Sequence, residues 1–133
     1  MISIRSSADM ERALGNVLDP ALRLLLTQRR DQLAEDTDYD FAELAHIIVV
    51  CPGDNLAAVE AEAGIAIASN LVDGSRLGEA DFSPSFEYVE QHPGGWNEAV
   101  MILSDDGFGI VLFVPDRIDV DPMLSLLMRR ALA

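Results

Sequence analysis

Residues 99–114, AVMILSDDGFGIVLFV, decide the fold more than any other stretch of this 133-residue chain. Two apolar runs, Ala99 to Leu103 and Phe108 to Val114, flank a polar Ser-Asp-Asp-Gly segment at residues 104–107. An Asp-Gly pair between two such runs is the strongest short-range signal of a β-hairpin, because glycine adopts the positive φ that the turn requires. The sequence therefore predicts a hairpin over about residues 97–114, and Pro115 ends its second strand.

Further strands are predicted before this hairpin. Ile47 to Val50 is a continuous β-branched run, which is typical of a buried strand. Phe86 to Gln91 is a second candidate, and it leads into a loop at Pro93-Gly94-Gly95. Ile65 to Ala68 is a candidate for a short additional strand.

Helices are predicted on both sides of these strands in the sequence. Asp19-Pro20 divides an apolar-periodic stretch into helices over about 8–18 and 20–34, because aspartate is a good N-cap and proline suits the first helical position. A short helix over 55–63 fits between Asp54 as its cap and Gly64 as its C-terminal glycine. Asp121-Pro122 repeats the aspartate-proline start and opens a last helix over about 122–132.

This order of elements predicts one α+β domain over residues 1–133. It contains a small, largely antiparallel sheet of about three to five strands. Two N-terminal helices, a short middle helix and a C-terminal helix pack on one side of that sheet. The chain length is near the common size of a single domain, and no linker divides it.

The charge is distributed unevenly along the chain. The net charge is −14, and residues 31–90 hold fourteen acids against Arg76 alone. This acidic middle part includes the closely spaced Asp36, Asp38 and Asp40. It repels phosphate backbones, so we expect no nucleic-acid partner, and it favours a basic protein partner or serves only solubility.

The remaining composition points to a cytoplasmic protein. Cys51 is the only cysteine, so no internal disulfide can form, which fits a reducing compartment. The first residues lack the apolar core of a secretory signal, and no apolar run approaches the length of a membrane span. We therefore expect no membrane association, while the oligomeric state stays open.

The aspartate clusters do not predict a metal or a cofactor. Asp36, Asp38 and Asp40 have the alternate spacing that begins a calcium loop, but Phe41 and Ile47 stand where that loop needs glycine and glutamate. A second cluster contains Asp116, Asp119 and Asp121, and Asp105 and Asp106 at the hairpin turn could join it. Turn formation and helix capping account for most of these residues.

An enzyme remains an alternative, either through these carboxylates or through Cys51. His46 and Cys51 are five residues apart, so on a strand they point to opposite faces and cannot form a nucleophile-base pair. Cys51 with His92 stays open as a pair. The acidic surroundings, however, raise a thiol pKa and thereby favour a structural cysteine.

Trp96 follows two glycines and is the only tryptophan. A tryptophan that enters a strand is typical of a core, whereas an exposed aromatic residue beside glycines could border a binding site. We therefore include Trp96 with Asp36, Asp38 and Asp40 among the candidate partner-binding residues.

One stretch resembles a known family. His46-Ile47-Ile48-Val49-Val50-Cys51-Pro52-Gly53-Asp54-Asn55-Leu56, continuing to Gly64, is similar to the opening of a LysM module. The resemblance implies a strand, a Pro-Gly-Asp turn, a short helix and a second strand near residues 65–70. It also implies binding of peptidoglycan-type glycans. It covers roughly 25 residues, and its turn-and-cap chemistry is common.

The sequence therefore favours a non-enzymatic interaction or regulatory module that binds a basic protein partner. A small hydrolase centred on carboxylates or on Cys51 is one alternative, and a LysM-like glycan-binding module is the other.

Overall fold

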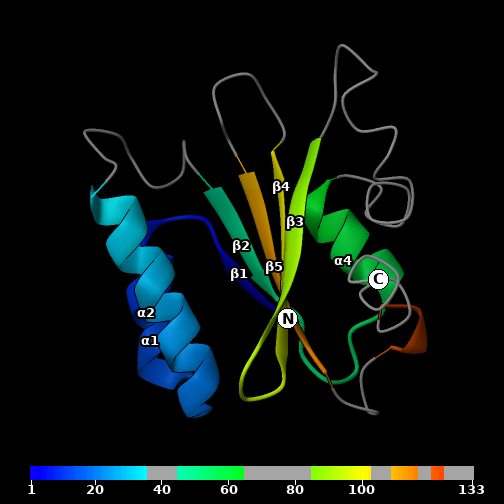
Figure 1. Cartoon of the computed structure of the whole chain (residues 1–133), viewed down its shortest axis with the longest axis horizontal. Coiled ribbons are helices and arrows are strands. Elements are labelled where there is room, and N and C mark those ends of the chain that lie inside the picture. The colour runs from blue at the N-terminus through cyan, green and yellow to red at the C-terminus, as the bar shows by residue number, and fades with distance from the viewer. Residues whose placement is uncertain (36–44, 65–84, 103–108, 117–120, 125–133) are drawn as a thin grey trace.

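The fold is a five-stranded sheet with helices on both faces (Figure 1). A computed structural model describes residues 1–35, 45–64, 85–102, 109–116 and 121–124. The elements in chain order are β1 (Ile2–Ile4), α1 (Ser7–Asn16), α2 (Pro20–Glu35), β2 (Ala45–Val49), α4 (Leu56–Ala63), β3 (Ser85–His92), β4 (Trp96–Ile102) and β5 (Gly109–Pro115).

The predicted α+β class and the predicted hairpin are confirmed. The strand order is β1-β2-β5-β4-β3, and only β2 and β5 run parallel. Strands β4 and β5 pair antiparallel from Trp96 opposite Pro115 to Ile102 opposite Gly109. The Asp-Gly turn between them lies outside the described residues. Strand β1 was not predicted, because three residues are too short to produce a periodic pattern.

The helix starts follow capping chemistry. Asp19 accepts a hydrogen bond from Ala21 N at 2.9 Å, as the prediction of its capping role requires. The cap of α4 differs from the prediction, since Asn55 accepts from Ala58 N while Asp54 accepts from Cys51 N within the preceding turn. Gly64 has φ +75° and ends α4 in the left-handed conformation, as expected.

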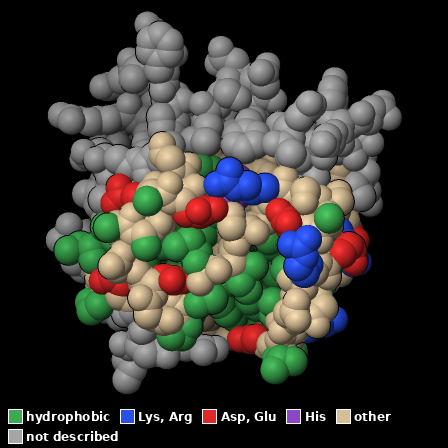
Figure 2. Space-filling model, turned by 180° about the vertical axis from the view of Figure 1, so that it is seen from behind, with side chains coloured by type: hydrophobic (Ala, Val, Ile, Leu, Met, Phe, Trp, Pro, Cys, Tyr) green, Lys and Arg blue, Asp and Glu red, His purple; other side chains and the backbone are tan. Residues whose placement is uncertain are grey.

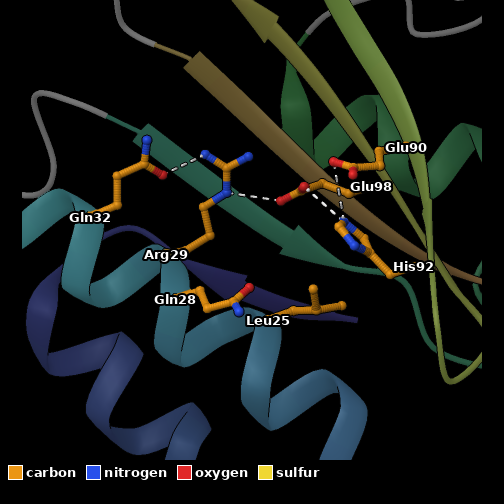
Figure 3. Close-up of a pocket in the computed structure, with 7 residues that line it drawn as sticks. All are labelled: Leu25, Gln28, Arg29, Gln32, Glu90, His92 and Glu98. Atoms are coloured by element: carbon orange, nitrogen blue, oxygen red, sulfur yellow. Dashed lines mark hydrogen bonds and ion pairs between the residues drawn. The ribbon is translucent and has the colours of Figure 1, made fainter.

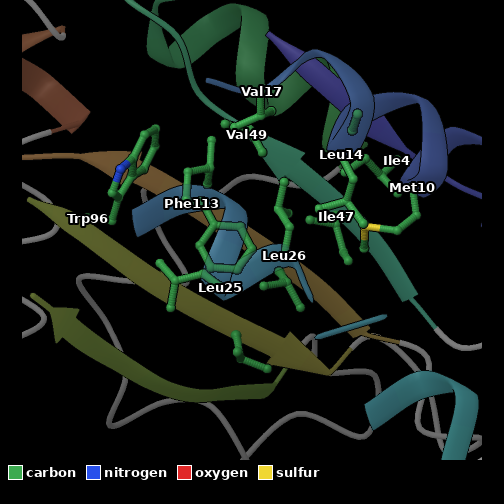
Figure 4. Close-up of a cluster of buried hydrophobic side chains, with 14 residues drawn as sticks. Ile4, Met10, Leu14, Val17, Leu25, Leu26, Ile47, Val49, Trp96 and Phe113 are labelled. Atoms are coloured by element: carbon green, nitrogen blue, oxygen red, sulfur yellow. The ribbon is translucent and has the colours of Figure 1, made fainter. Parts of the chain in front are cut away.

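The sheet buries both faces, so the expectation of helices on one side only is wrong. One cluster packs α1 and α2 against one face, and it includes Leu26, Ile47, Trp96 and Phe113 (Figure 4). The other cluster packs α4 and Leu124 against the opposite face, with Ile48, Val59, Met101 and Leu112 among its members. Strand β5 is a continuous apolar run, and β2 is apolar except for the buried His46, because neither of their faces meets water.

Several predicted features lie outside the described residues. These are the strand at 65–68, the turn at 104–107 and the C-terminal helix beyond residue 124. Pro122 to Leu124 are helical and follow Asp121, whose carboxylate accepts from Met123 N at 3.0 Å.

Candidate functional site

A polar pocket lies between α2 and the β3–β4 hairpin (Figure 3). Its volume is about 320 Å³. Helix α2 contributes one apolar side chain, two amides and a guanidinium, while the hairpin contributes two carboxylates and an imidazole. The lining residues are Leu25, Gln28, Arg29, Gln32, Glu90, His92 and Glu98.

Glu98 is the centre of this pocket. Its side chain is only 6% exposed, and each of its oxygens has a partner. Arg29 Nε donates to Oε2 at 2.8 Å, and His92 Nε2 lies 3.1 Å from Oε1. Glu90 is far more open at 59% exposure, and its Oε2 lies 3.9 Å from the same imidazole nitrogen. Two carboxylates and one imidazole therefore converge on a common volume.

The hairpin geometry explains this convergence. Glu90 and His92 are two residues apart on β3 and share a face, and Glu98 on β4 stands directly opposite Glu90. The turn at Pro93-Gly94-Gly95 lies close against α2, because a Cβ at Gly94 would overlap the Cβ of Ala21. Sequence analysis missed this site, although the spacing Glu90-x-His92-Pro-Gly-Gly-x-x-Glu98 carries the signal once the turn is recognised as a hairpin.

A second polar cluster lies where β1 and β2 meet α4. Ser3 Oγ donates to Glu62 Oε1 at 2.6 Å and lies 2.8 Å from His46 Nε2. Arg5 pairs with the same Glu62 oxygen at 3.1 Å. Burial lowers the pKa of His46, and the positive charge of Arg5 adds to this effect, whereas Glu62 opposes it. Hydrogen bonds from Ser3 and Arg5 lower the pKa of Glu62.

This second cluster has the composition of a serine-histidine-acid triad but not its arrangement. A hydroxyl has one hydrogen, and Ser3 gives it to Glu62, so His46 Nε2 is the donor in the contact with Ser3. A nucleophilic serine instead needs a histidine that accepts its proton and an acid that orients the histidine from behind. Among the described residues, these hydrogen bonds connect β1 to α4 and supply no activated serine.

The outer face of α4 is unusual for a surface helix. Ala57, Ala58 and Ala61 are exposed, while Val59 on the opposite side is fully buried. Residues 45–64, which contain this helix, carry three acids and no Arg, whereas residues 1–35 carry five Arg and five acids. Residues 45–64 are therefore net acidic, although Asp54 pairs with the N-terminal ammonium and Glu62 with Arg5, whereas residues 1–35 are balanced. On the face in Figure 2, the Arg side chains are separated by acidic and uncharged ones.

The predicted partner-binding residues have different positions. Trp96 is 5% exposed, and its indole Nε1 donates to Asp19 Oδ2 at 3.1 Å, so its side chain belongs to the core. We therefore leave Trp96 out of the binding surface proposed below. Asp36, Asp38 and Asp40 lie outside the described residues.

The candidate hydrolase residues do not come together among the described residues. Cys51 is half-buried, and its Sγ contacts the carbonyl of Val49 rather than either histidine. Asp116 accepts from Gln91, and Asp121 accepts from Leu56 N at 2.7 Å, so each carboxylate has a separate structural partner. Asp105, Asp106 and Asp119 lie outside the described residues.

The LysM resemblance meets a topological obstacle. Strand β2, the Pro-Gly turn, α4 and Gly64 occur in the expected order, and residues 65–70 lie outside the described residues. However, β2 is paired with β1 on one edge and with β5 on the other. A closing strand after Gly64 would find no free edge on β2.

Comparison with protein-family models, curated proteins and solved structures finds no match for this chain. Within the described residues, no helix combines the length and the apolar character needed to cross a membrane.

Proposed function

We propose that the protein is a non-enzymatic interaction module that binds a basic protein partner through the outer face of α4. The observation that carries this proposal is the exposed alanine face of Ala57, Ala58 and Ala61 in an acidic layer of the molecule. A helix face of this kind has little side-chain bulk, so a partner element can approach it closely.

Charge complementarity defines the partner's chemistry. Glu60 lies beside the alanine face and is partly exposed, and residues 45–64 carry three acids and no Arg. Such a surface attracts Lys and Arg side chains at the rim of an interface and speeds association by steering. Glu62 is engaged by Ser3 and Arg5, so it contributes to the field of this face rather than to a new ion pair.

A matched pair of variants tests the proposal. Ala61→Arg and Ala61→Glu add comparable bulk to the same exposed helical position, and both residues are good helix formers. They differ in charge, so a basic partner should lose affinity for Ala61→Arg much more strongly than for Ala61→Glu. We expect a difference of at least about tenfold, which corresponds to 1.4 kcal/mol.

The measurement is a quantitative pull-down from the native host with wild-type, Ala61→Arg and Ala61→Glu baits. The captured partner should be basic, should be lost with Ala61→Arg and should be retained better with Ala61→Glu. Equal capture by all three baits, a partner that is not basic, or no specific capture would each contradict the proposal.

A further inference from the structure

We infer that Glu90, His92 and Glu98 form a binding site for a divalent first-row transition metal ion such as Zn²⁺. The inference is independent of the proposed partner surface, because the pocket lies on the α2 side of the sheet. It goes beyond the sequence analysis, which considered only aspartate clusters as metal ligands.

The distances between the three side chains are close to those of a metal site. The three ligand atoms all lie within 4.8 Å of one another, and His92 Nε2 is 3.1 Å from Glu98 Oε1 and 3.9 Å from Glu90 Oε2. Zinc bonds of about 2.0–2.2 Å at tetrahedral angles place ligand atoms roughly 3.3 Å apart. A small rotation of the exposed Glu90 side chain would close the remaining gap.

The ligand types select the class of ion. An imidazole nitrogen with two carboxylate oxygens suits Zn²⁺ and neighbouring first-row ions. Magnesium and calcium prefer all-oxygen surroundings and would gain less from His92. The three side chains come from one hairpin, and hydrogen bonds to Glu98 already hold two of the ligands, Glu98 and His92, in place.

Arg29 is placed to act as a positioning residue. Its Nε donates to Oε2 of Glu98 at 2.8 Å, which leaves Oε1 directed at His92. A hydrogen-bonded ligand carboxylate is the usual arrangement around protein-bound metals, because it fixes the orientation of the ligand. The guanidinium also balances one of the two carboxylate charges in this pocket, so the fold does not require the ion.

The pocket leaves room for the ion to keep further ligands. Three protein ligands leave at least one position of a tetrahedral ion open, and a space of about 320 Å³ adjoins them. Gln28 and Gln32 line that space from α2 and offer amide groups to a water or small anion on the ion.

The test is a titration of the metal-free full chain with zinc chloride, followed by calorimetry and by the imidazole NMR signals. The chain has two histidines, and the signals that disappear in His92→Ala identify those of His92. We expect one ion per chain and a shift of the His92 signals, while those of His46 stay in place. Glu90→Gln and His92→Ala should each weaken binding by about tenfold or more.

Glu11→Gln is the matched control. Glu11 is an exposed acid paired with Arg30, and its loss should leave the zinc affinity unchanged. Because Glu90 is also exposed, Glu90→Gln should keep the fold, which circular dichroism verifies. No zinc binding by the wild type, a shift of His46 rather than His92, or an unchanged affinity in Glu90→Gln and His92→Ala would overturn the inference.

Discussion

The two faces of the sheet are buried alike but covered by different layers. On one face lie the two helices α1 and α2, of 10 and 16 residues, and a polar pocket opens between α2 and the β3–β4 hairpin. On the other face, α4 has only eight residues and buries Val59 completely, while Ala57, Ala58 and Ala61 face outward. The comparison teaches that equal burial of a sheet does not imply equal roles. One layer encloses charged groups, whereas the other exposes small alanine side chains beside Glu60.

The largest expected effect tests whether the side chains on both faces of the sheet form well-packed cores. Leu112 and Phe113 are adjacent on β5, fully buried, and point to opposite faces. Phe113→Ala should lower the free energy of unfolding by roughly 3–5 kcal/mol and Leu112→Ala by roughly 2–5 kcal/mol, since each leaves a cavity. Chemical denaturation measures both. A cost below about 1 kcal/mol for Leu112→Ala would mean that the α4 layer is not a packed core.

The next prediction concerns the contact that holds the hairpin turn to α2. Gly94 and Gly95 both have positive φ, but only a Cβ at Gly94 would overlap Ala21. Gly95→Ala should therefore cost roughly 1–2 kcal/mol from backbone strain, and Gly94→Ala roughly 2–4 kcal/mol because overpacking adds to it. Denaturation curves of both variants give the difference.

The double variant Gly94→Ala with Ala21→Gly supplies the control for this contact. It removes the overlapping Cβ from α2. Part of the lost free energy of unfolding should therefore be recovered, although glycine destabilises the helix. Equal destabilisation by Gly94→Ala and Gly95→Ala would show that the turn does not press on the helix.

Sequence reasoning found the elements that depend on local chemistry. The Asp19-Pro20 start of α2, the glycine end of α4 and the β4–β5 hairpin follow from capping, positive φ and two apolar runs around a turn. The features that sequence analysis missed depend on contacts between residues that are far apart in the chain. Arg29, for example, pairs with Glu98, which is 69 residues away in the chain. The pocket could not be predicted, because it requires knowing that the hairpin packs on α2.

The smallest predicted effect is the part of the pH dependence of stability that comes from His46, on the α4 side of the sheet. Burial lowers the pKa of His46 from its usual 6.5, so the native state resists its protonation. Above about pH 7 the imidazole is neutral in both the folded and the unfolded chain, so the native state keeps its full stability. As the pH falls through 6.5, the unfolded chain takes up the proton first, and stability decreases until the folded pKa is reached.

His46→Gln should remove this part of the pH dependence, because glutamine does not titrate and can still hydrogen-bond to Ser3. The free energy of unfolding of wild type and variant is compared between about pH 7.5 and 5.5, a range around the usual histidine pKa. An identical pH dependence in both proteins would show that His46 is not buried in its neutral form.

The most direct test of the central claim is the association rate with the captured basic partner across a salt series. If the acidic middle part of the chain, residues 31–90, steers that partner, the rate should fall steeply as salt increases. Changing Asp36, Asp38 and Asp40 to Asn should slow association several-fold at low salt and leave the free energy of unfolding nearly unchanged. A rate that does not depend on salt and is the same in the triple variant would contradict the account, and the acids would then serve solubility alone.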